Sequence, residues 1–522
     1  MAKSKQNKDE NKNFVLTLPI KMNACDEHIL DKRYEYLRQI YNIAQRRLLN
    51  QFMYFAFTKE FKSIKTIKEK KDFFKTHPFK IKGYDKEITF TEFGIKSYLR
   101  NFAKLHVSKD KTYKDFGINT KILDGIFNNI WRAWNKRLYD LKVKKIHFKE
   151  YDELNNIPFG KNSNKKFVGL NVDLSNMVIE MNVNGGRESK AKFITFNLKK
   201  DLNDYETFAL KGGCDSIKVI SIVRKEIRGK KKYYCQFCIE GEKPMKNRIL
   251  GKGQVGIDLG TSTIAVSSLN GVSIDILAEK CNKIDRETYI IDRKMDRSRR
   301  ATNPQNYTED GQIVRNKKGE TRKWNYSKHY IKLRSKRKEL YRKNAAIRKI
   351  EHEMTANKLL SLGNVFVVEN NPIKGWQTRA KETTINKKGK YNSKKRYGKS
   401  IANHAPSEFI TILENKVVSL GGKFEKVDIK NSASRFDFTN ETFNEHNVGV
   451  RKITLSNGNI HQRDMLASFN LQHLVIPNEN LKEYDVEQMK LDYPIYCKLE
   501  EQEIALYKNG NKKQYKSVIG KW

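Results

Sequence analysis

The spacing of apolar residues changes along this chain, and that change constrains the fold more than any other feature of the sequence. Residues 14–20 (FVLTLPI) are β-branched and aromatic, which predicts a strand. In residues 26–53 apolar side chains recur at intervals of three and four, which predicts an amphipathic helix, and helical patterns continue to about residue 145. Short strand-like runs from about 165 to 245 favour a small barrel or sandwich. Because 522 residues also exceed what one core usually serves, we expect a multidomain α+β protein.

The second half of the chain mixes strands with helices. A long helix is predicted over 328–362, and its first part, 328–350, carries ten Lys/Arg and one acidic residue. Its apolar stripe repeats at intervals of seven: Leu333, Leu340, Ile347 and Met354. The run VFVVEN, residues 365–370, is typical of a buried central strand. A helix is predicted over 463–475, and the tail beyond about 478 is polar and weakly patterned.

The charge of the chain indicates a polyanionic partner. Its 104 Lys+Arg and 60 Asp+Glu give a formal net charge of +44, while 38% hydrophobic and 11% aromatic residues suffice for real cores. Such an excess opposes a compact state unless a polyanion neutralises it, and nucleic acid is the natural candidate. A protein of membrane surfaces is disfavoured, because we find neither a lipidation motif nor an amphipathic anchor.

The sequence also predicts where the protein works. It has no apolar run of about 18 residues and no signal-like start, so we expect neither a membrane span nor secretion. Six scattered cysteines are too few for a disulfide framework, which favours a reduced, cytoplasmic setting. Cys235 and Cys238 form a lone CxxC inside a predicted strand, where they would point to opposite faces. We therefore predict no zinc.

Three carboxylates stand at the edges of predicted elements. Asp258 lies in the apolar strand VGIDLG, Glu369 ends VFVVE, and Asp464 opens the helix RDMLASFNL. A charge at the end of an apolar strand costs free energy unless it is paired or bound to a metal, and salt bridges to the many Lys/Arg are the alternative. If the fold brings the three together, these hard oxygen ligands suit Mg²⁺ or Mn²⁺, and a two-metal site could hydrolyse a phosphodiester.

Nucleotide hydrolysis is a competing interpretation of the same segment. GIDLGTST also resembles the first phosphate loop of the actin and heat-shock-chaperone ATPases, but a second Asp-Gly-Gly-rich loop is missing. Gly398-Lys399-Ser400 ends like a P-loop, yet Ser393 stands where that motif needs glycine.

Taken together, these motifs resemble those of TnpB-type transposon nucleases and compact type V CRISPR effectors with a split RuvC domain. The matching segments are GIDLGTSTIAVSSLNG, VFVVEN and HQRDMLASFNLQHL. The third follows the family pattern D-x-N-A-A-x-N-[IL] at Asp464, Ala467, Asn470 and Leu471, with Ser468 where Ala is expected. The likeness spans about residues 14–475 and is strongest over the RuvC segments.

The resemblance implies a domain order. It comprises a disordered start with the first wedge strand (1–23), a helical recognition domain (24–155), a β-barrel wedge domain (156–250), a split RuvC nuclease domain of RNase H-like α/β fold (251–475) and a C-terminal tail (476–522). Many relatives carry a four-cysteine zinc ribbon between the second and third RuvC segments, whereas this chain has no cysteine between Glu369 and Asp464. The insert 430–462 must either do that work without zinc or lack that function.

The resemblance also implies the activity and its residues. Such proteins bind a guide RNA, pair it with one strand of double-stranded target DNA and cut at one RuvC site, in prokaryotic cytoplasm at the nucleoid. By carry-over Asp258, Glu369 and Asp464 would be catalytic and hold Mg²⁺ or Mn²⁺, and Arg463 could touch the scissile phosphate. Nucleic-acid contacts are expected from four arginines of the long helix: Arg334, Arg337, Arg342 and Arg348.

Three alternatives stay open at this point. One is a guide-dependent DNA-binding repressor that does not cut, and another is a nucleic-acid-binding protein without a guide. The third is a junction resolvase that cuts branched DNA. The sequence leaves the oligomeric state and the transposon or CRISPR origin of the guide open.

Overall fold

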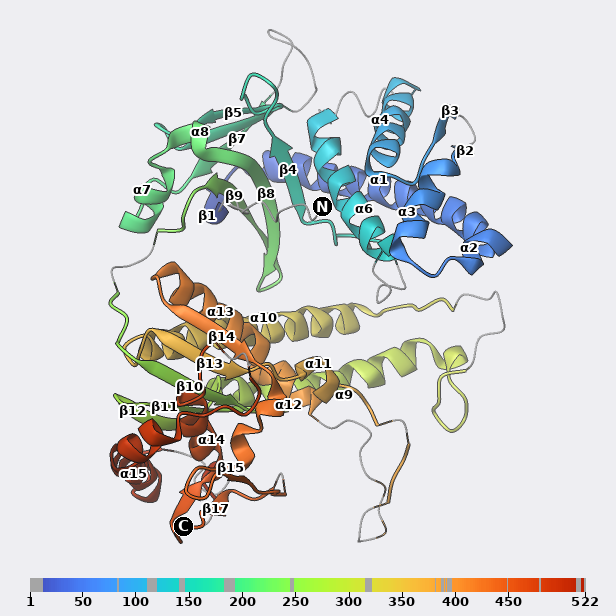
Figure 1. Ribbon diagram of the computed structural model, residues 1–522. Coiled ribbons are helices and arrows are strands. Elements are labelled where there is room, and N and C mark those ends of the chain that lie inside the picture. The colour runs from blue at the N-terminus through green and yellow to red at the C-terminus, as the bar shows by residue number, and fades with distance from the viewer. Residues whose placement is uncertain are drawn as a thin grey trace. The chain divides into compact units, whose positions relative to one another are not determined.

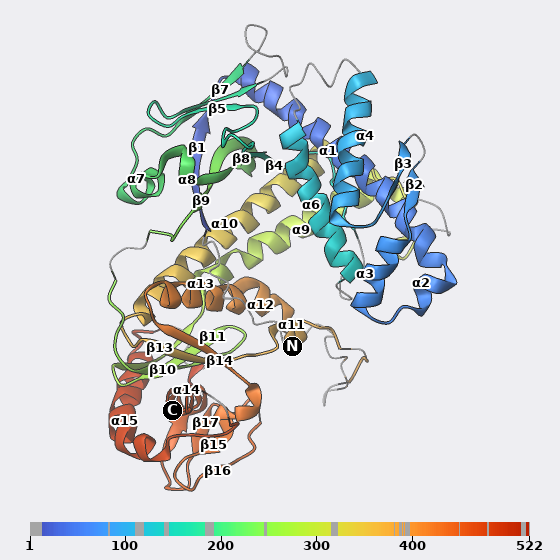
Figure 2. The same cartoon turned by 45° about the horizontal axis from the view of Figure 1, so that its top comes forward.

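A computed structural model of the chain (Figures 1 and 2) separates into two compact units, Met1–Pro244 and Met245–Trp522. It describes residues 13–81, 84–109, 120–139, 146–182, 193–244, 248–314, 322–380, 382–385, 389, 391, 397–447, 449–477, 480–512 and 518–520. Residues 1–12, most of the predicted disordered start, lie outside that set. Both units combine helices and sheets, so the predicted multidomain α+β class is correct. Within the described residues, no helix has both the length and the apolar character to cross a membrane.

Unit 1 begins with one strand and then a helical region. The helices are α1 (Ala24–Phe57), α2 (Lys59–Ser63), α3 (Ile67–Thr76), α4 (Glu92–Lys109) and α6 (Thr120–Tyr139). The start of α1 is capped by the side chain of Asn23, which accepts from the backbone N–H of Asp26. The core of this region is aromatic, and its fully buried Trp134 donates from Nε1 to Gln45 Oε1 at 2.7 Å. The Trp134 ring is therefore a core group.

A small hairpin lies within the helical region, where the sequence predicts breaks in the helical pattern near His77-Pro78 and Lys82-Gly83. Strands β2 (Phe79–Ile81) and β3 (Tyr84–Ile88) pair between α3 and α4. Pro78 lies just before β2, and Phe79 and Ile88 are buried at the ends of the hairpin. Two buried anchors in so short a segment are too few to produce the strand-like alternation that a sequence pattern can reveal.

The sheet of unit 1 is open, which corrects the predicted β-barrel of residues 156–250. Seven strands run in the order β4-β8-β9-β1-β7-β6-β5. They are β1 (Asn13–Lys21), β4 (Asn156–Gly160), β5 (Leu170–Asp173), β6 (Val178–Asn182), β7 (Phe193–Leu198), β8 (Ile217–Ile227) and β9 (Lys230–Glu240). Among the described residues the edges β4 and β5 share no ladder, and their flanks meet only in the isolated bridge Lys161–Phe167. One bridge supplies too few hydrogen bonds to close the sheet.

Two details of this sheet agree with the sequence. Strand β1 lies at its centre, pairing antiparallel with β9 and with β7, so the first strand completes a sheet whose other members lie far along the chain. In β9 the Cys235 side chain is buried and Cys238 is half-buried on the opposite face.

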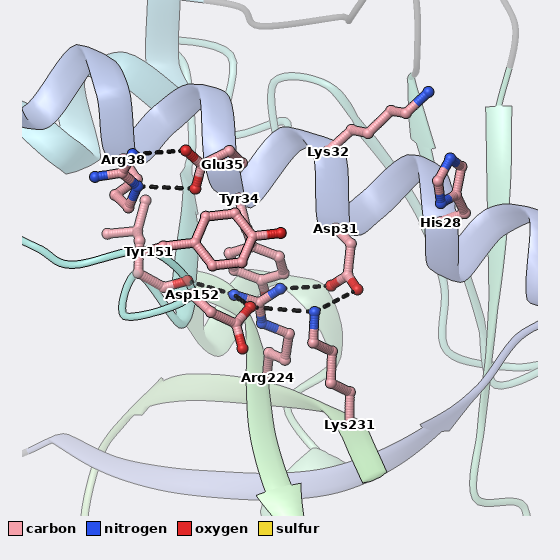
Figure 3. Close-up of a pocket in the computed structure, with 11 residues that line it drawn as sticks. His28, Asp31, Lys32, Tyr34, Glu35, Arg38, Tyr151, Asp152, Arg224 and Lys231 are labelled. Atoms are coloured by element: carbon pink, nitrogen blue, oxygen red, sulfur yellow. Dashed lines mark hydrogen bonds and ion pairs between the residues drawn. The ribbon is translucent and has the colours of Figure 1, made fainter. Parts of the chain in front are cut away.

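A cavity of about 330 Å³ in unit 1 is lined by an ion-pair network (Figure 3). Arg224, only 4% exposed, donates to Asp31 Oδ1 at 2.5 Å and pairs with Asp152 at 2.8 Å, and its guanidinium lies 4.5 Å from the centre of the Tyr34 ring. Lys231 pairs with the same two carboxylates. Burial alone would raise the pKa of Asp31, but hydrogen bonds from Lys231 and Arg224 outweigh it and lower that pKa. The network ties α1 to β8 and β9.

Replacing Arg224 tests whether this network holds unit 1 together. Arg224→Met leaves Lys231 as the cation that remains beside two half-buried carboxylates, with the hydroxyl of Tyr233 still on Asp31, and we expect a loss of about 3 kcal/mol in the free energy of unfolding. The matched control is Arg38→Met in the same cavity, because Arg38 pairs with Glu35 one turn away on its own helix, and its replacement should cost no more than about 1 kcal/mol. Denaturant unfolding measures both, and equal losses would contradict the assignment.

Unit 2 is built on a mixed five-stranded sheet in the order β12-β11-β10-β13-β14. The strands are β10 (Gln254–Leu259), β11 (Thr263–Ser268), β12 (Gly271–Ile276), β13 (Val365–Glu369) and β14 (Lys423–Val427). The first three form an antiparallel meander, while β13 and β14 run parallel to β10. Strand β13 is central and buried, as the VFVVEN run predicted.

Helices cover both faces of this sheet (Figure 1). They are α9 (Asp285–Thr302), α10 (Lys328–Leu359), α11 (Ile373–Trp376), α12 (Gly398–His404), α13 (Pro406–Ser419), α14 (Arg463–Gln472) and α15 (Val486–Lys508). Side chains of α10 and α13 pack with Ile257 and Val368 on one face, whereas α14 and α15 pack with Val367 and Ile274 on the other. The result is a three-layer α/β/α arrangement.

The buried face of α10 rotates away from the predicted stripe. Leu333 and Leu340 are buried, but Met354 is 62% exposed, and His352, Ala356 and Leu359 take its place. A strict interval of seven drifts by about 20° per heptad on a straight helix of 3.6 residues per turn. Three heptads therefore carry Met354 off the packed face, and this part of the prediction is wrong.

The residues after 475, which the sequence set apart as a tail, contribute to the second core. Helix α15 buries Met489, Tyr496 and Ile504 against α14 and the sheet. Its packed face also contains acids: Asp492 pairs with His473 at 2.9 Å, and Glu500 accepts from the backbone N–H of Gln462 at 2.7 Å. Because partnered carboxylates interrupt the apolar pattern, the helix looked polar in sequence.

The insert 430–462 consists of two small hairpins. They are β15 (Phe436–Asp437) with β16 (Thr442–Phe443), and β17 (Lys452–Thr454) with β18 (Ile460–Gln462). Buried Asp437 accepts hydrogen bonds from the backbone N–H and hydroxyl of Thr439, at 3.0 and 2.6 Å, and from those of Ser456, at 2.9 and 2.8 Å. One carboxylate thereby links the two hairpins.

Candidate active site

Helix α14 lies directly on strand β10, and a glycine makes this contact possible. A Cβ on Gly256 would lie 2.0 Å from the backbone oxygen of Ser468 and 2.4 Å from the nitrogen of Gln472. Strand and helix therefore touch backbone to backbone, which any side chain at position 256 would prevent. Ser468 stands where the family pattern has Ala, and its hydroxyl is satisfied within the helix by the carbonyl of Met465.

Two of the predicted acids lie on neighbouring parallel strands. Ile257 of β10 pairs with Val368 of β13, so Asp258 and Glu369 follow on the next rung. Side chains alternate along a strand, so both acids belong to the face that Gly256 and Val367 present to α14. The pairing register, which the sequence could not supply, brings them side by side.

The third acid comes from the helix. Asp464 is the second residue of α14, which begins where the side chain of Gln462 accepts from the backbone N–H of Met465. Because residue 468 lies over Gly256, the first turn of α14 reaches the ends of β10 and β13. All three acids line one cavity of about 830 Å³. The sequence-predicted trio is therefore gathered in one place.

The cavity makes Asp258 and Glu369 hard to ionise. Burial raises the pKa of Asp258 well above its usual value, and the negative charges of Asp464 and Glu369 raise it further, against the opposing effect of Arg463 and Arg451. Burial also raises the pKa of Glu369 to about 7. Strongly perturbed carboxyl groups gathered in one cavity mark a candidate functional site.

Two arginines hold Asp464. Arg463 donates to its Oδ1 from Nε at 2.9 Å and from Nη2 at 2.6 Å, and Arg451 donates to its Oδ2 from Nη1 at 2.7 Å. Arg463 was predicted to touch a scissile phosphate, and in the structure its observed partner is this neighbouring carboxylate. The sequence did not single out Arg451, because it lies in a polar stretch with no pattern that ties it to an acid thirteen residues later.

The sequence analysis also did not identify other residues that line the cavity. The lining includes the polar loop Thr261–Ser262–Thr263 after β10, the aromatic residues Trp376 and Tyr397, and Arg435 and His446 of the insert. Carboxylates, cations and aromatic rings around one hollow suit a strand of nucleic acid, whose phosphates and bases need both charge and stacking.

The acids suit a divalent ion by their chemistry, although their present arrangement is not a ligand set. Within the described part of the chain, no three His, Cys, Asp or Glu side chains are placed to hold a metal as they stand. The donor types nevertheless fit Mg²⁺ or Mn²⁺: three carboxylates share the cavity, and a cation there would favour the ionised form of Asp258. Asp464 could become a metal ligand only if the ion replaced one of the two arginines that now bind its carboxylate.

The four arginines predicted to contact nucleic acid lie on α10 in different environments. Arg337 pairs with Asp292 at 2.9 Å and Arg342 with Glu339 at 2.7 Å. Arg348 pairs with Glu408 and donates to the carbonyl of Ala402, so it ties α10 to α12 and α13. Arg334 is exposed, with its guanidinium 6.0 Å from the centre of the Tyr326 ring.

Comparisons with known proteins give structural likenesses only. No protein-family model and no curated protein matches the chain. Among solved structures it is similar to a Cas12f1–sgRNA–target DNA complex, at TM-score 0.45 and 14% identity over 88% of this chain and 98% of that one. It is also similar to the mini-RNA-guided endonuclease CRISPR-Cas_phi3, at TM-score 0.32 and 11% identity over 88% and 92% of the two chains. Because these TM-scores are low, we draw the function from the chain's own residues.

The contact at Gly256 can be tested directly. Gly256→Ala should lower the free energy of unfolding of unit 2 by about 3 kcal/mol, because two backbone atoms cannot move aside for the new methyl group. Gly449→Ala is the control, since a Cβ there meets nothing within 4 Å and should change stability by less than about 0.5 kcal/mol. Thermal unfolding compares the variants, and a Gly256→Ala protein as stable as the control would refute the close approach.

Proposed function

We propose that this protein is an RNA-guided endonuclease that cuts DNA by metal-dependent phosphodiester hydrolysis at the cavity of Asp258, Glu369 and Asp464. One observation carries the proposal: three acids from two parallel strands and a helix line a single cavity together with arginines. Acids alone would suit many cation sites. Acids beside phosphate-binding arginines suit a phosphodiester and a divalent ion together.

The residues of the cavity have distinct roles in this proposal. Asp258, Glu369 and Asp464 would hold Mg²⁺ or Mn²⁺, which supplies an activated water and stabilises the charge that develops on the phosphate. Arg435 lies in the same cavity and pairs with exposed Glu445 only at 3.5 Å, so it can turn to a phosphate. Trp376 and Tyr397 offer rings on which bases flanking that phosphate can stack.

A second surface of unit 2 supports nucleic-acid binding. A shallow cavity of about 490 Å³ between α9 and α10 is lined by Lys294, Arg297 and His329, and no carboxylate of the described residues pairs with Lys294 or Arg297. Nearby, the rings of Tyr326 and Tyr330 stack at 4.6 Å. Unpaired cations and the exposed ring of Tyr326 are suited to phosphates and unstacked bases.

Two features favour a guide RNA as a partner: the charge of the chain and the resemblance of its motifs. The net charge of +44 exceeds what a few phosphate contacts would need, and the chain shows no base-reading motif such as a zinc finger or homeodomain. A protein that leaves sequence reading to base pairing supplies mainly backbone contacts. The likeness of its motifs to those of TnpB-type and type V effectors therefore favours a guide over unguided binding.

A guide-dependent repressor that binds without cutting is the second candidate. It is favoured by the two arginines on Asp464, which leave that carboxylate engaged with protein cations. Retention of all three acids favours the nuclease. Cleavage measurements separate the two, because a repressor would bind the programmed target and leave it intact.

Sequencing the RNA that copurifies with the protein tests the guide, and the complex then tests the chemistry. We expect one RNA species with a constant scaffold and a variable end, and cleavage of a matching duplex in Mg²⁺ that stops with chelator and returns with Mn²⁺.

Asp258→Asn should reduce cleavage to background and leave target binding intact. It should not lower stability, because burial already disfavours the ionised form. Undiminished cutting by Asp258→Asn would remove the proposed site.

Charge reversal tests the surface between α9 and α10. The double variant Lys294→Glu/Arg297→Glu should weaken nucleic-acid binding about tenfold and reduce the salt dependence by about two phosphate contacts. The matched control, Lys490→Glu/Lys498→Glu on α15, makes the same change in net charge on exposed lysines. Binding isotherms at several salt concentrations compare the two. Equal weakening would mean that only net charge matters.

A further inference from the structure

The insert 430–462 delivers Arg451 to the third acid by a simple backbone device. Strand β18 runs directly into α14, and β17 pairs with it antiparallel, with Lys452 opposite Gln462. One step beyond this pair, the backbone N–H of Arg463 donates to the carbonyl of Arg451 at 3.0 Å. The hairpin therefore fixes the backbones of Arg451 and Arg463 next to each other, one cation on each oxygen of Asp464.

Arg463 and Arg451 differ in how easily their side chains can move away from Asp464. Arg463 adjoins Asp464 in the first turn of α14, and its side chain is only 15% exposed, so it stays beside the carboxylate. The Arg451 side chain is 33% exposed and lines the open cavity, and the contact with Asp464 Oδ2 can break without moving either backbone. Arg451 is thus the mobile member of the pair.

A divalent ion and Arg451 compete for the carboxylate of Asp464. The carboxylate oxygen that would bind the ion accepts from a guanidinium, and two positive charges repel at that separation. A phosphate in the cavity changes this balance, because a guanidinium binds phosphate oxygens as well as it binds a carboxylate. A strand of nucleic acid can therefore draw Arg451 away from Asp464.

We propose that Arg451 is a positioning residue that couples metal binding to substrate binding. The inference rests on the proposed function and adds how binding of the metal at that site is regulated. Without a strand in the cavity, Arg451 competes with the ion for Asp464 and keeps the metal affinity low. With a strand bound, Arg451 moves to the phosphate, Asp464 is free for the ion, and metal and strand bind cooperatively, each raising the affinity for the other by the same factor.

Calorimetric titration with Mn²⁺ tests this coupling without relying on cleavage. The full-length protein is titrated alone and with a single-stranded phosphorothioate oligonucleotide that resists cutting. We expect the oligonucleotide to tighten Mn²⁺ binding of the wild type about fivefold to tenfold. Arg451→Ala should bind Mn²⁺ tighter by a similar factor without the oligonucleotide and gain nothing from adding it, while binding the oligonucleotide itself more weakly.

Matched variants separate this role from a structural one. Lys430→Ala removes an exposed cation of the same insert that is not among the residues lining the cavity, and it should leave the Mn²⁺ affinity and the coupling unchanged. Arg451→Lys keeps a cation and should fall between the wild type and Arg451→Ala. A merely structural residue would weaken Mn²⁺ binding when replaced, which is the opposite sign.

The outcomes also separate this inference from the proposed function. If Arg451→Ala binds Mn²⁺ no tighter than the wild type, or if the oligonucleotide still tightens its Mn²⁺ binding as in the wild type, the coupling through Arg451 is wrong, even where Asp258→Asn abolishes Mn²⁺ binding. If Asp258→Asn and Asp464→Asn bind Mn²⁺ as the wild type does, the metal site and the inference fail together.

Discussion

The backbone contact between strand β10 and helix α14 determines the rest of unit 2. Because Gly256 has no side chain, the carbonyl oxygen of Ser468 can lie in the space that a Cβ at position 256 would need. That contact fixes how far α14 lies along the strand, and so which residue of its first turn reaches the ends of β10 and β13. A shift of one helical turn would move Asp464 about 5 Å away from Asp258 and Glu369.

Buried charge is used differently in the two units. In unit 1 the carboxylates of Asp31 and Asp152 meet Arg224 and Lys231 in equal numbers, and the network joins a helix to two strands. In the cavity of unit 2 burial and the charges of Asp464 and Glu369 raise the pKa of Asp258, and Arg451 and Arg463 pair with Asp464. Balanced networks stabilise a structure, whereas an unbalanced cluster of acids has the electrostatics of a binding site.

Several misjudged elements share a physical cause. The stripe on α10 was extrapolated at intervals of seven, but the straight helix turns its buried face from Leu340 towards His352. The helix α15 was missed because Glu500 and Glu503 are buried among its apolar residues, where backbone and side-chain donors satisfy them. The barrel was expected because strand spacing cannot report whether the edge strands β4 and β5 share hydrogen bonds. In each case the pattern of neighbouring residues does not report which packing or hydrogen-bonding partner the element meets in the fold.

The sequence alone determined elements such as β1, α1, β13 and α14, because local patterns of apolar residues, caps and turns are set by neighbours. It also determined which acids were unusual, since a carboxylate ending an apolar strand is conspicuous without any structure. Only the tertiary structure decided that Asp258, Glu369 and Asp464 share a cavity, because the strand register and the approach of α14 depend on long-range contacts. It alone revealed Arg451, whose position beside Asp464 follows from the pairing of β17 with β18 and leaves no pattern in the sequence.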